Sequence, residues 1–168
     1  MKHVVIAGFV LAAGIAVVVA QEPAKADIKD AQGQTIGTAT LTETPHGVLI
    51  HTILTKAPAG THAFHIHQTG ACVAPFTTAG GHFNPAMKQH GITNPMGMHA
   101  GDMPNIEVPA SGQLTFDVLA SGVTLAAGPN SVFDADGSAL VLHQTGDDYK
   151  SDPAGNAGGR IACGVITK

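Results

Sequence analysis

The chain has few aromatic and few charged residues. Its 168 residues include six Phe, one Tyr and no Trp, and charged residues make up only 12%. So few aromatic rings exclude a stacking platform for single-stranded nucleic acid. Twelve acidic residues against eight basic ones give a net charge of −4, which does not favour a polyanionic partner. The composition therefore excludes a nucleic-acid module, and it also excludes a coiled coil.

The first twenty residues predict a secretory signal. A short basic start precedes the apolar run Val4–Ala20, which ends in the small residues expected at a cleavage site. An uncleaved anchor is the alternative, since the run is close to the shortest that spans a bilayer. Cleavage after Ala20 leaves 168 − 20 = 148 residues, and loss of Lys2 changes the net charge from −4 to −5. We expect an exported protein, located in the periplasm.

Only two cysteines are present, Cys72 and Cys163. Export places them in an oxidising compartment, where a disulfide is the default state and two buried thiols are the alternative. A bridge would close a loop of about ninety residues and contribute about 4 kcal/mol in the chain-entropy model. It would also tie the segment around Cys72 to the C-terminal strand.

Short runs of alternating polarity predict an all-β fold. Each run is at most eight residues long and is bounded by Gly, Pro, Asn or Asp. We find no amphipathic helix of ten or more residues, no repeat and no second domain in the sequence. Such strands predict an antiparallel sandwich or barrel. The expected strands cover residues 35–42, 47–54, 62–67, 113–119 and 139–143.

The rest of the chain divides into a leader, one domain and two long loops. Residues 21–31 are expected to be a leader, flexible up to Ala26, or a first strand, and residues 32–168 a single domain. Residues 70–105 and 144–159 carry many Gly and Pro residues and little strand pattern. Long loops in a compact domain are usually functional, and both of these adjoin strands that contain histidine.

The number of histidines, ten, is unusually high, and this favours a metal site. His65 and His67 alternate on an expected strand, so both imidazoles project from one face. His143 ends another expected strand and could turn inward to join them. The alternative is that these histidines are packed or exposed strand residues without a ligand role.

The first long loop adds His82, His90 and His99, with Asp102 close behind. Three imidazoles and one carboxylate are a closed tetrahedral set suited to zinc. Solvated histidines on a polar loop are the alternative. Together with the strand histidines there are seven candidate ligands, so two four-coordinate sites fit if one residue serves both.

Several motifs occur in the order found in copper/zinc superoxide dismutases. They are FHIHQTGAC, AGGHFNP, QHG, HAGD, ALVLH and GNAGGRIACGVI, and the match runs from about Gly33 to Ile166. DDYKSDPAGNAGGR resembles the exported bacterial branch of that family. The resemblance implies a Greek-key, immunoglobulin-like sandwich or flattened barrel with two long functional loops. It also implies one copper and one zinc ion per chain and the dismutation of superoxide to dioxygen and hydrogen peroxide.

The resemblance implies a role for each candidate residue. The implied copper ligands are His65, His67, His82 and His143, and the implied zinc ligands are His82, His90, His99 and Asp102. His82 would be the imidazolate that bridges the two ions and carries a proton in turnover. Asp147 would hydrogen-bond one histidine of each site, His65 and His90. Arg160 would orient the anionic substrate, and Cys72 and Cys163 would form the family disulfide.

Other interpretations stay open at this point. The metal loop carries Met87, Met96, Met98 and Met103, which either bind Cu(I) through sulfur or fill gaps in the packing. His46, His51 and His62 match no ligand position and are read as strand or turn residues. A copper-binding protein without activity is one competing class, and a zinc hydrolase is another, although no His-Glu-x-x-His helix appears. We expect a monomer or a homodimer.

Overall fold

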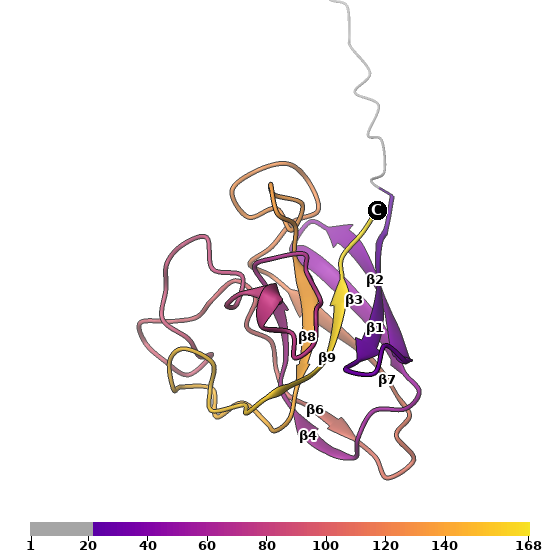
Figure 1. Ribbon diagram of the computed structural model, residues 1–168. Helices are drawn as coiled ribbons and strands as arrows, with labels where there is room; N and C mark the ends of the chain where they lie inside the picture. Colours follow the sequence, from indigo (N-terminus) through magenta and orange to yellow (C-terminus); the bar gives the residue numbers. More distant parts are fainter. Residues whose placement is uncertain (1–21) are drawn as a thin grey trace, which may run out of the picture.

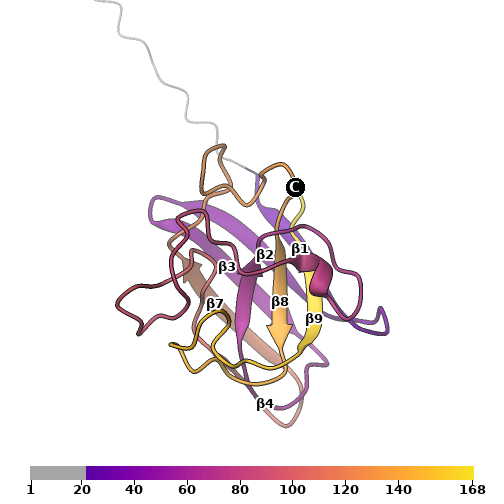
Figure 2. The same cartoon turned by 60° about the vertical axis from the view of Figure 1, so that its left-hand side comes forward.

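Residues 22–168 are described by the computed structural model, and they form a curled, antiparallel seven-stranded sheet beside a two-stranded one (Figures 1 and 2). The elements are β1 (Ala24–Asp30), β2 (Thr35–Thr44), β3 (Gly47–Leu54), β4 (Gly60–His62), β5 (Phe64–His67), the 3-10 turn η1 (Thr77–Ala79), β6 (Ile106–Val108), β7 (Leu114–Ala120), β8 (Ala139–His143) and β9 (Arg160–Val165). The strand order of the large sheet is β5-β8-β9-β1-β2-β3-β7, and β4 pairs with β6. The all-β prediction is confirmed.

The hairpin of β2 and β3 shows how the alternating pattern builds the barrel wall. Its register runs from Gly37 opposite Leu54 to Thr44 opposite Gly47. Alternate residues of β3 point into the core, where Val48 and Ile50 are fully buried. Gly47 has a φ of 124°, and a Cβ there would stand 2.5 Å from the carbonyl oxygen of Ala120. Only glycine therefore allows β3 to enter the sheet beside β7.

The histidine-bearing strands β5 and β8 differ from the others because every residue in both is buried. Phe64 and Ile66 of β5 fill the barrel interior, while His65 and His67 point to the opposite face. The two long loops cover that outer face. Figure 2 shows η1 in front of β8 and β9, and its buried Ala79 packs in one cluster with Val141 and Cys163.

A disulfide joins Cys72 in the first loop to Cys163 in β9, across a sequence separation of 91 residues. The predicted bridge is confirmed, and residues 22–168 contain no free cysteine. The two ends of the described chain also meet, since Lys25 pairs with Thr167 through two backbone hydrogen bonds of 2.8 Å (Figure 1). The C-terminal end of the chain is therefore fixed twice, by the disulfide at Cys163 in β9 and by the pairing of Thr167 with Lys25.

The structure corrects the sequence prediction in detail. Residues 24–26, expected within a flexible leader, belong to β1, where Ala24 and Ala26 are buried. The expected strand 62–67 is divided between β4 and β5. The short strand β6 was not predicted. The expected signal segment, residues 1–20, lies outside the described residues. Within residues 22–168, no helix has the length and apolar character needed to cross a bilayer.

Candidate metal centre

Seven buried side chains from three parts of the chain converge on the outer face of β5 and β8. The first loop supplies four of them, β5 supplies two, and β8 ends on the last; they are His65, His67, His82, His90, His99, Asp102 and His143. They form two groups, and within each group the ligand atoms lie within 4.8 Å of one another. These groups have the membership expected from the sequence.

The first group is made of imidazoles only: His65, His67, His82 and His143. His65 donates from Nε2 to Asp147 over 3.0 Å, and His67 donates from Nδ1 to the carbonyl oxygen of Gly80 over 3.0 Å. A neutral imidazole that donates from one nitrogen carries a lone pair on the other. Both rings therefore turn a lone pair toward the group centre.

Buried nitrogens of this group lack a hydrogen-bond partner. Nδ1 of His65 and Nε2 of His82 are both buried without one. Nε2 of His67 and Nε2 of His143 face each other at 3.2 Å. Burial of unpaired nitrogens is costly, and a cation bound by their lone pairs removes that cost. The donor set fits copper, since imidazole is a suitable ligand for that metal.

The second group gathers three ring nitrogens around one carboxylate oxygen. Oδ1 of Asp102 lies 2.8 Å from Nδ1 of His82, 3.0 Å from Nδ1 of His90 and 3.2 Å from Nδ1 of His99. Nδ1 of His99 is 3.4 Å from Nδ1 of His82. Ligands bound tetrahedrally to zinc at 2.0–2.1 Å stand about 3.3 Å apart. The spacing and the donor types both fit zinc.

His82 belongs to both groups, with a different nitrogen in each. Its Nδ1 faces Asp102, and its buried Nε2 faces the imidazole group. Its ring centroid is 4.2 Å from that of His65 and 5.1 Å from that of His90. One imidazole thus links the two groups directly.

Asp147 provides a second link between the two groups, in addition to His82. Its Oδ2 accepts from Nε2 of His65 and its Oδ1 from Nε2 of His90, each over 3.0 Å. Asn105 holds this segment, because its side chain donates to the Asp147 carbonyl and accepts from the Asp147 N–H. A Cβ at residue 155 would stand 1.7 Å from Oδ1 of Asp147, so Gly155 is required for the close approach.

Electrostatics distinguish the two groups. Burial lowers the pKa of His67 to about 2 and that of His143 to about 3, with neighbouring imidazoles adding to the effect. Burial also lowers the pKa of His82, and Asp102 offsets only part of this, leaving it at about 4. These three rings stay neutral at pH 7 and keep their lone pairs for a metal.

His90 shows the opposite shift. Burial lowers its pKa, but hydrogen bonds to Asp102 and Asp147 outweigh that effect and raise it to about 9. Burial acts on Asp102 in the upward direction, yet hydrogen bonds from His82, His90 and His99 hold its pKa well below the usual range. Both ring nitrogens of His90 face carboxylate oxygens, so a positive charge stabilises this arrangement. The charge can come from protonation of the ring or from a bound metal ion.

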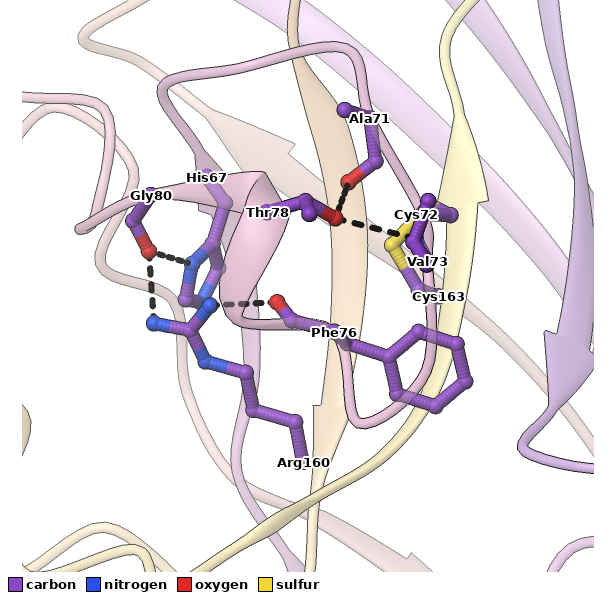
Figure 3. Close-up of a disulfide and its surroundings, with 9 residues drawn as sticks. All are labelled: His67, Ala71, Cys72, Val73, Phe76, Thr78, Gly80, Arg160 and Cys163. Carbon is purple, nitrogen blue, oxygen red and sulfur yellow. Dashed lines mark hydrogen bonds between the residues drawn. A yellow bond between two sulfur atoms is a disulfide. The ribbon is translucent and has the colours of Figure 1, made fainter.

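Arg160 stands at the edge of the imidazole group. Its guanidinium donates to the carbonyl oxygens of Phe76 and Gly80, each over 2.5 Å, and Gly80 is also the acceptor for His67 (Figure 3). A cavity of about 530 Å³ opens beside it, with His82, His99 and Arg160 among its lining residues. The mouth of the site is therefore cationic on one side.

Sequence reasoning did not find several supporting groups. The Gly80 carbonyl and the Asn105 amide orient ligands but carry no pattern that marks them. Asp152 accepts from the His90 N–H over 2.6 Å, and its Oδ1 lies 3.9 Å from Nε2 of His99. His62 faces the carbonyl oxygens of His143 and Pro58 and stands outside both groups.

A curled β-sheet that carries two adjacent donor sets with one shared imidazole defines a binuclear metalloprotein. Residues 35–166 match the family described as copper/zinc superoxide dismutase (SODC). The chain belongs to the copper/zinc superoxide dismutase family. It is an oxidoreductase that dismutates superoxide, with one copper and one zinc ion as cofactors.

Individual relatives agree with this assignment. "Superoxide dismutase [Cu-Zn] 1" of Aquifex aeolicus is 53% identical over 144 residues, covering 84% of this chain and 85% of that protein. "Superoxide dismutase [Cu-Zn]" of Caulobacter vibrioides is 43% identical over 147 residues, covering 85% and 84%. The crystal structure of the P104H mutant of a SOD-like protein from Bacillus subtilis superposes with a TM-score of 0.82 at 38% identity, covering 86% and 97%. With the disulfide, these bacterial relatives fit a protein that works outside the cytoplasm.

Proposed function

We propose that the imidazole group holds copper and that the carboxylate-containing group holds zinc. The observation that carries this assignment is the position of His82, whose two nitrogens face different groups. The ligand atoms for copper are Nδ1 of His65 and Nε2 of His67, His82 and His143. Those for zinc are Nδ1 of His82, His90 and His99 and an oxygen of Asp102. All-imidazole donors suit a redox metal, and the set with a carboxylate suits a redox-silent one.

Copper, when bound, supplies the one-electron oxidation and the one-electron reduction by which two superoxide ions and two protons yield dioxygen and hydrogen peroxide. The chain supplies proton handling and placement. Nε2 of His82 takes up a proton in one half of the cycle and gives it to the reduced oxygen species in the other. Asp102 holds the opposite nitrogen, so the ring stays oriented while its Nε2 changes state.

Arg160 attracts and orients superoxide. Arginine keeps its charge at any working pH and presents several donors to an oxygen anion. Its two hydrogen bonds to the loop fix the guanidinium beside the cavity that reaches His82. Removal of residues 1–20 leaves a net charge of −5, so a local positive charge is needed at the cavity to bring in an anion.

The protein works in the periplasm, as a monomer or a homodimer, after removal of residues 1–20. Each chain carries both complete donor groups, so one copy suffices for a site. The mass of the native protein, measured by sedimentation equilibrium, distinguishes monomer from dimer. An N-terminal sequence that begins at Gln21 in a periplasmic extract supports cleavage and location, and a membrane-bound full-length chain contradicts both.

Metal analysis with a superoxide assay on the native protein tests the assignment. We expect one copper and one zinc per chain and turnover that requires copper. In the His90→Ala variant, zinc should be lost and copper retained, since His90 is a member of the carboxylate-containing group and not of the imidazole group. The His143→Ala variant should do the reverse. The opposite pattern would overturn the assignment, and two bound metals without turnover would favour a copper-binding protein.

A further inference from the structure

The methionines of the first long loop lie outside the two histidine groups, and most are exposed. Met87 is 90% exposed, Met96 64% and Met98 38%, whereas Met103 is 1% exposed. Core packing therefore accounts for Met103 alone among the methionines of residues 22–168. Exposed thioether side chains gathered within twelve residues of loop require another explanation.

Backbone pairing places Met96 and Met98 beside the segment that follows Met87. The N–H of Gln89 donates to the carbonyl oxygen of Met96 over 3.2 Å, and Gln89 pairs in parallel with Gly97. Paired backbones lie about 5 Å apart. Met96 and Met98 are the two neighbours of Gly97 in one of the paired segments. Met87 lies two residues before Gln89 in the other segment. A methionine side chain has three rotatable bonds, so its sulfur can adjust its position toward an ion that several methionines share.

Asn94 closes this segment of the loop. Its side chain donates to Oε1 of Gln89 over 3.2 Å and to the carbonyl oxygen of His90 over 2.9 Å, and its Oδ1 accepts from the Met96 N–H. The backbone that carries Met96 is therefore tied to the backbone beside Met87. The exposed side chain of Met96 projects from this anchored backbone.

This segment also borders the cavity that reaches His82 of the imidazole group. Met87 and Lys88 line the same cavity as His82 and Arg160. Thioether sulfur is a soft ligand that selects Cu(I). The positive charges of Lys88 and Arg160 oppose the binding of a cation, so the sulfur ligands must supply the affinity. Hard cations, which require oxygen ligands, gain nothing from this surface.

We propose that Met87, Met96 and Met98 form a Cu(I)-binding site next to the cavity that Met87 lines, and that this site receives reduced copper before the copper reaches the imidazole group. This site is distinct from both histidine groups and uses sulfur only. It holds the ion without an electron transfer or a proton transfer. Its existence does not depend on which metal each histidine group holds.

Silver(I), a redox-stable substitute for Cu(I), tests binding in the protein loaded with copper and zinc. With the resident copper reduced and chloride absent, the ¹³C-labelled methyl groups of Met87, Met96 and Met98 should shift together and saturate at one added equivalent. The methyl group of Met103 should not move. No shift at one equivalent, or separate titrations of the three methyl groups, would overturn the site.

Two sets of variants complete the test. Replacement of all three methionines (Met87→Leu, Met96→Leu and Met98→Leu) should abolish binding of the added ion in native mass spectrometry. The control Met103→Leu should retain it. The receiving role is measured by loading Cu(I) into the zinc-only protein, where the triple variant should load at least several-fold more slowly and reach the same final copper content. An unchanged loading rate would overturn the receiving role.

Discussion

The guanidinium of Arg160 and the ring of His67 donate to the same acceptor, the carbonyl oxygen of Gly80. The distances are 2.5 Å from Arg160 and 3.0 Å from Nδ1 of His67 (Figure 3). The bond from Nδ1 fixes the ring so that its Nε2 faces the imidazole group. One carbonyl oxygen of the loop therefore positions both Arg160, which attracts the substrate, and His67, a proposed copper ligand.

Loss of the Arg160 charge should slow substrate capture without loss of metal. The Arg160→Gln variant should lower the second-order rate with superoxide at least about tenfold, because local positive fields raise on-rates by about 10 to 10³-fold. Arg160→Glu should be slower still. The wild-type rate should fall as ionic strength rises, since salt screens the field over about 10 Å at 0.1 M. Pulse radiolysis and metal analysis on the same samples measure both quantities.

The matched control is Lys25→Gln, which removes one exposed positive charge on β1. Its rate should stay close to that of the wild type. A fully metallated Arg160→Gln variant with an unchanged rate would remove Arg160 from substrate capture.

Removal of the shared imidazole should damage both metal sites at once. His82→Ala deletes a nitrogen from each group, so copper and zinc contents should both fall and turnover should be nearly abolished. His90→Ala should remove zinc and leave copper, with activity that varies more strongly with pH because His82 loses its anchor. Metal analysis of the two variants, followed by pH profiles, provides the comparison. Wild-type contents of both metals in His82→Ala would refute the bridge.

Asp147 should couple the two sites. In Asp147→Asn, one oxygen remains as an acceptor, so only one of the bonds from His65 and His90 can be kept. Loss of such an orienting partner typically lowers metal affinity about 10- to 100-fold. Competition with a chelator should show weaker binding at one or both groups. Asp148→Asn, on the exposed neighbour, should leave both affinities unchanged, and equal affinities in the two variants would contradict the coupling.

The disulfide should support both stability and the anion site. Cys72→Ser is expected to reduce the free energy of unfolding by about 2–5 kcal/mol, as is typical for removal of a native bridge. It should also lower the rate with superoxide, because the loop that it anchors carries the Phe76 and Gly80 acceptors of Arg160. Chemical denaturation and rate measurements test the two effects. Two titratable thiols in the denatured, unreduced wild type would refute the bridge.

Acid should destabilise the metal-free protein. His67, His82 and His143 have pKa values lowered to about 2, 4 and 3, so the unfolded chain binds protons more readily than the native one. These three groups cost no stability above the ordinary histidine pKa of about 6.5, and the cost grows as the pH falls below that value. His90, with its pKa raised to about 9, acts oppositely and loses its contribution as the pH rises toward 9.

Chemical denaturation of chelator-treated protein at pH 7 and pH 5 measures the balance. Three lowered pKa values outweigh one raised value, so the free energy of unfolding should be smaller at pH 5. An equal or larger value at pH 5 would contradict the shifts.

The strand β3 could be predicted from strict alternation, because one of its faces is buried, and the run 47–54 coincides with it. The run 139–143 coincides with β8, which is buried on both faces and was predicted from its short apolar run. The start of β1 could not be predicted, since Ala24 and Ala26 read as weak leader residues and become buried only when β2 and Thr167 pair with them. Whether residues 24–26 form a strand therefore depends on pairing with residues that lie far away in the sequence.

Metal-ligand candidates were also predictable, because histidine and aspartate carry distinctive chemistry at each position. The atoms that orient them were not, because the acceptors at Gly80 and Phe76 are backbone carbonyls that any residue offers. The role of Gly155 likewise depends on the close approach of Asp147, which only the folded loop creates.

The bridge between Cys72 and Cys163 also protects the molecule from being separated into fragments by a protease. Every peptide bond from residue 73 to residue 162 lies inside the covalent ring that the disulfide closes, including those of the exposed loop around Met87 and all of those in residues 144–159. A protease that nicks either loop therefore releases no fragment, and both halves remain one particle until the bridge is reduced. His65 and His67 lie outside the ring and His143 inside it, so a nicked molecule still retains all of its histidines.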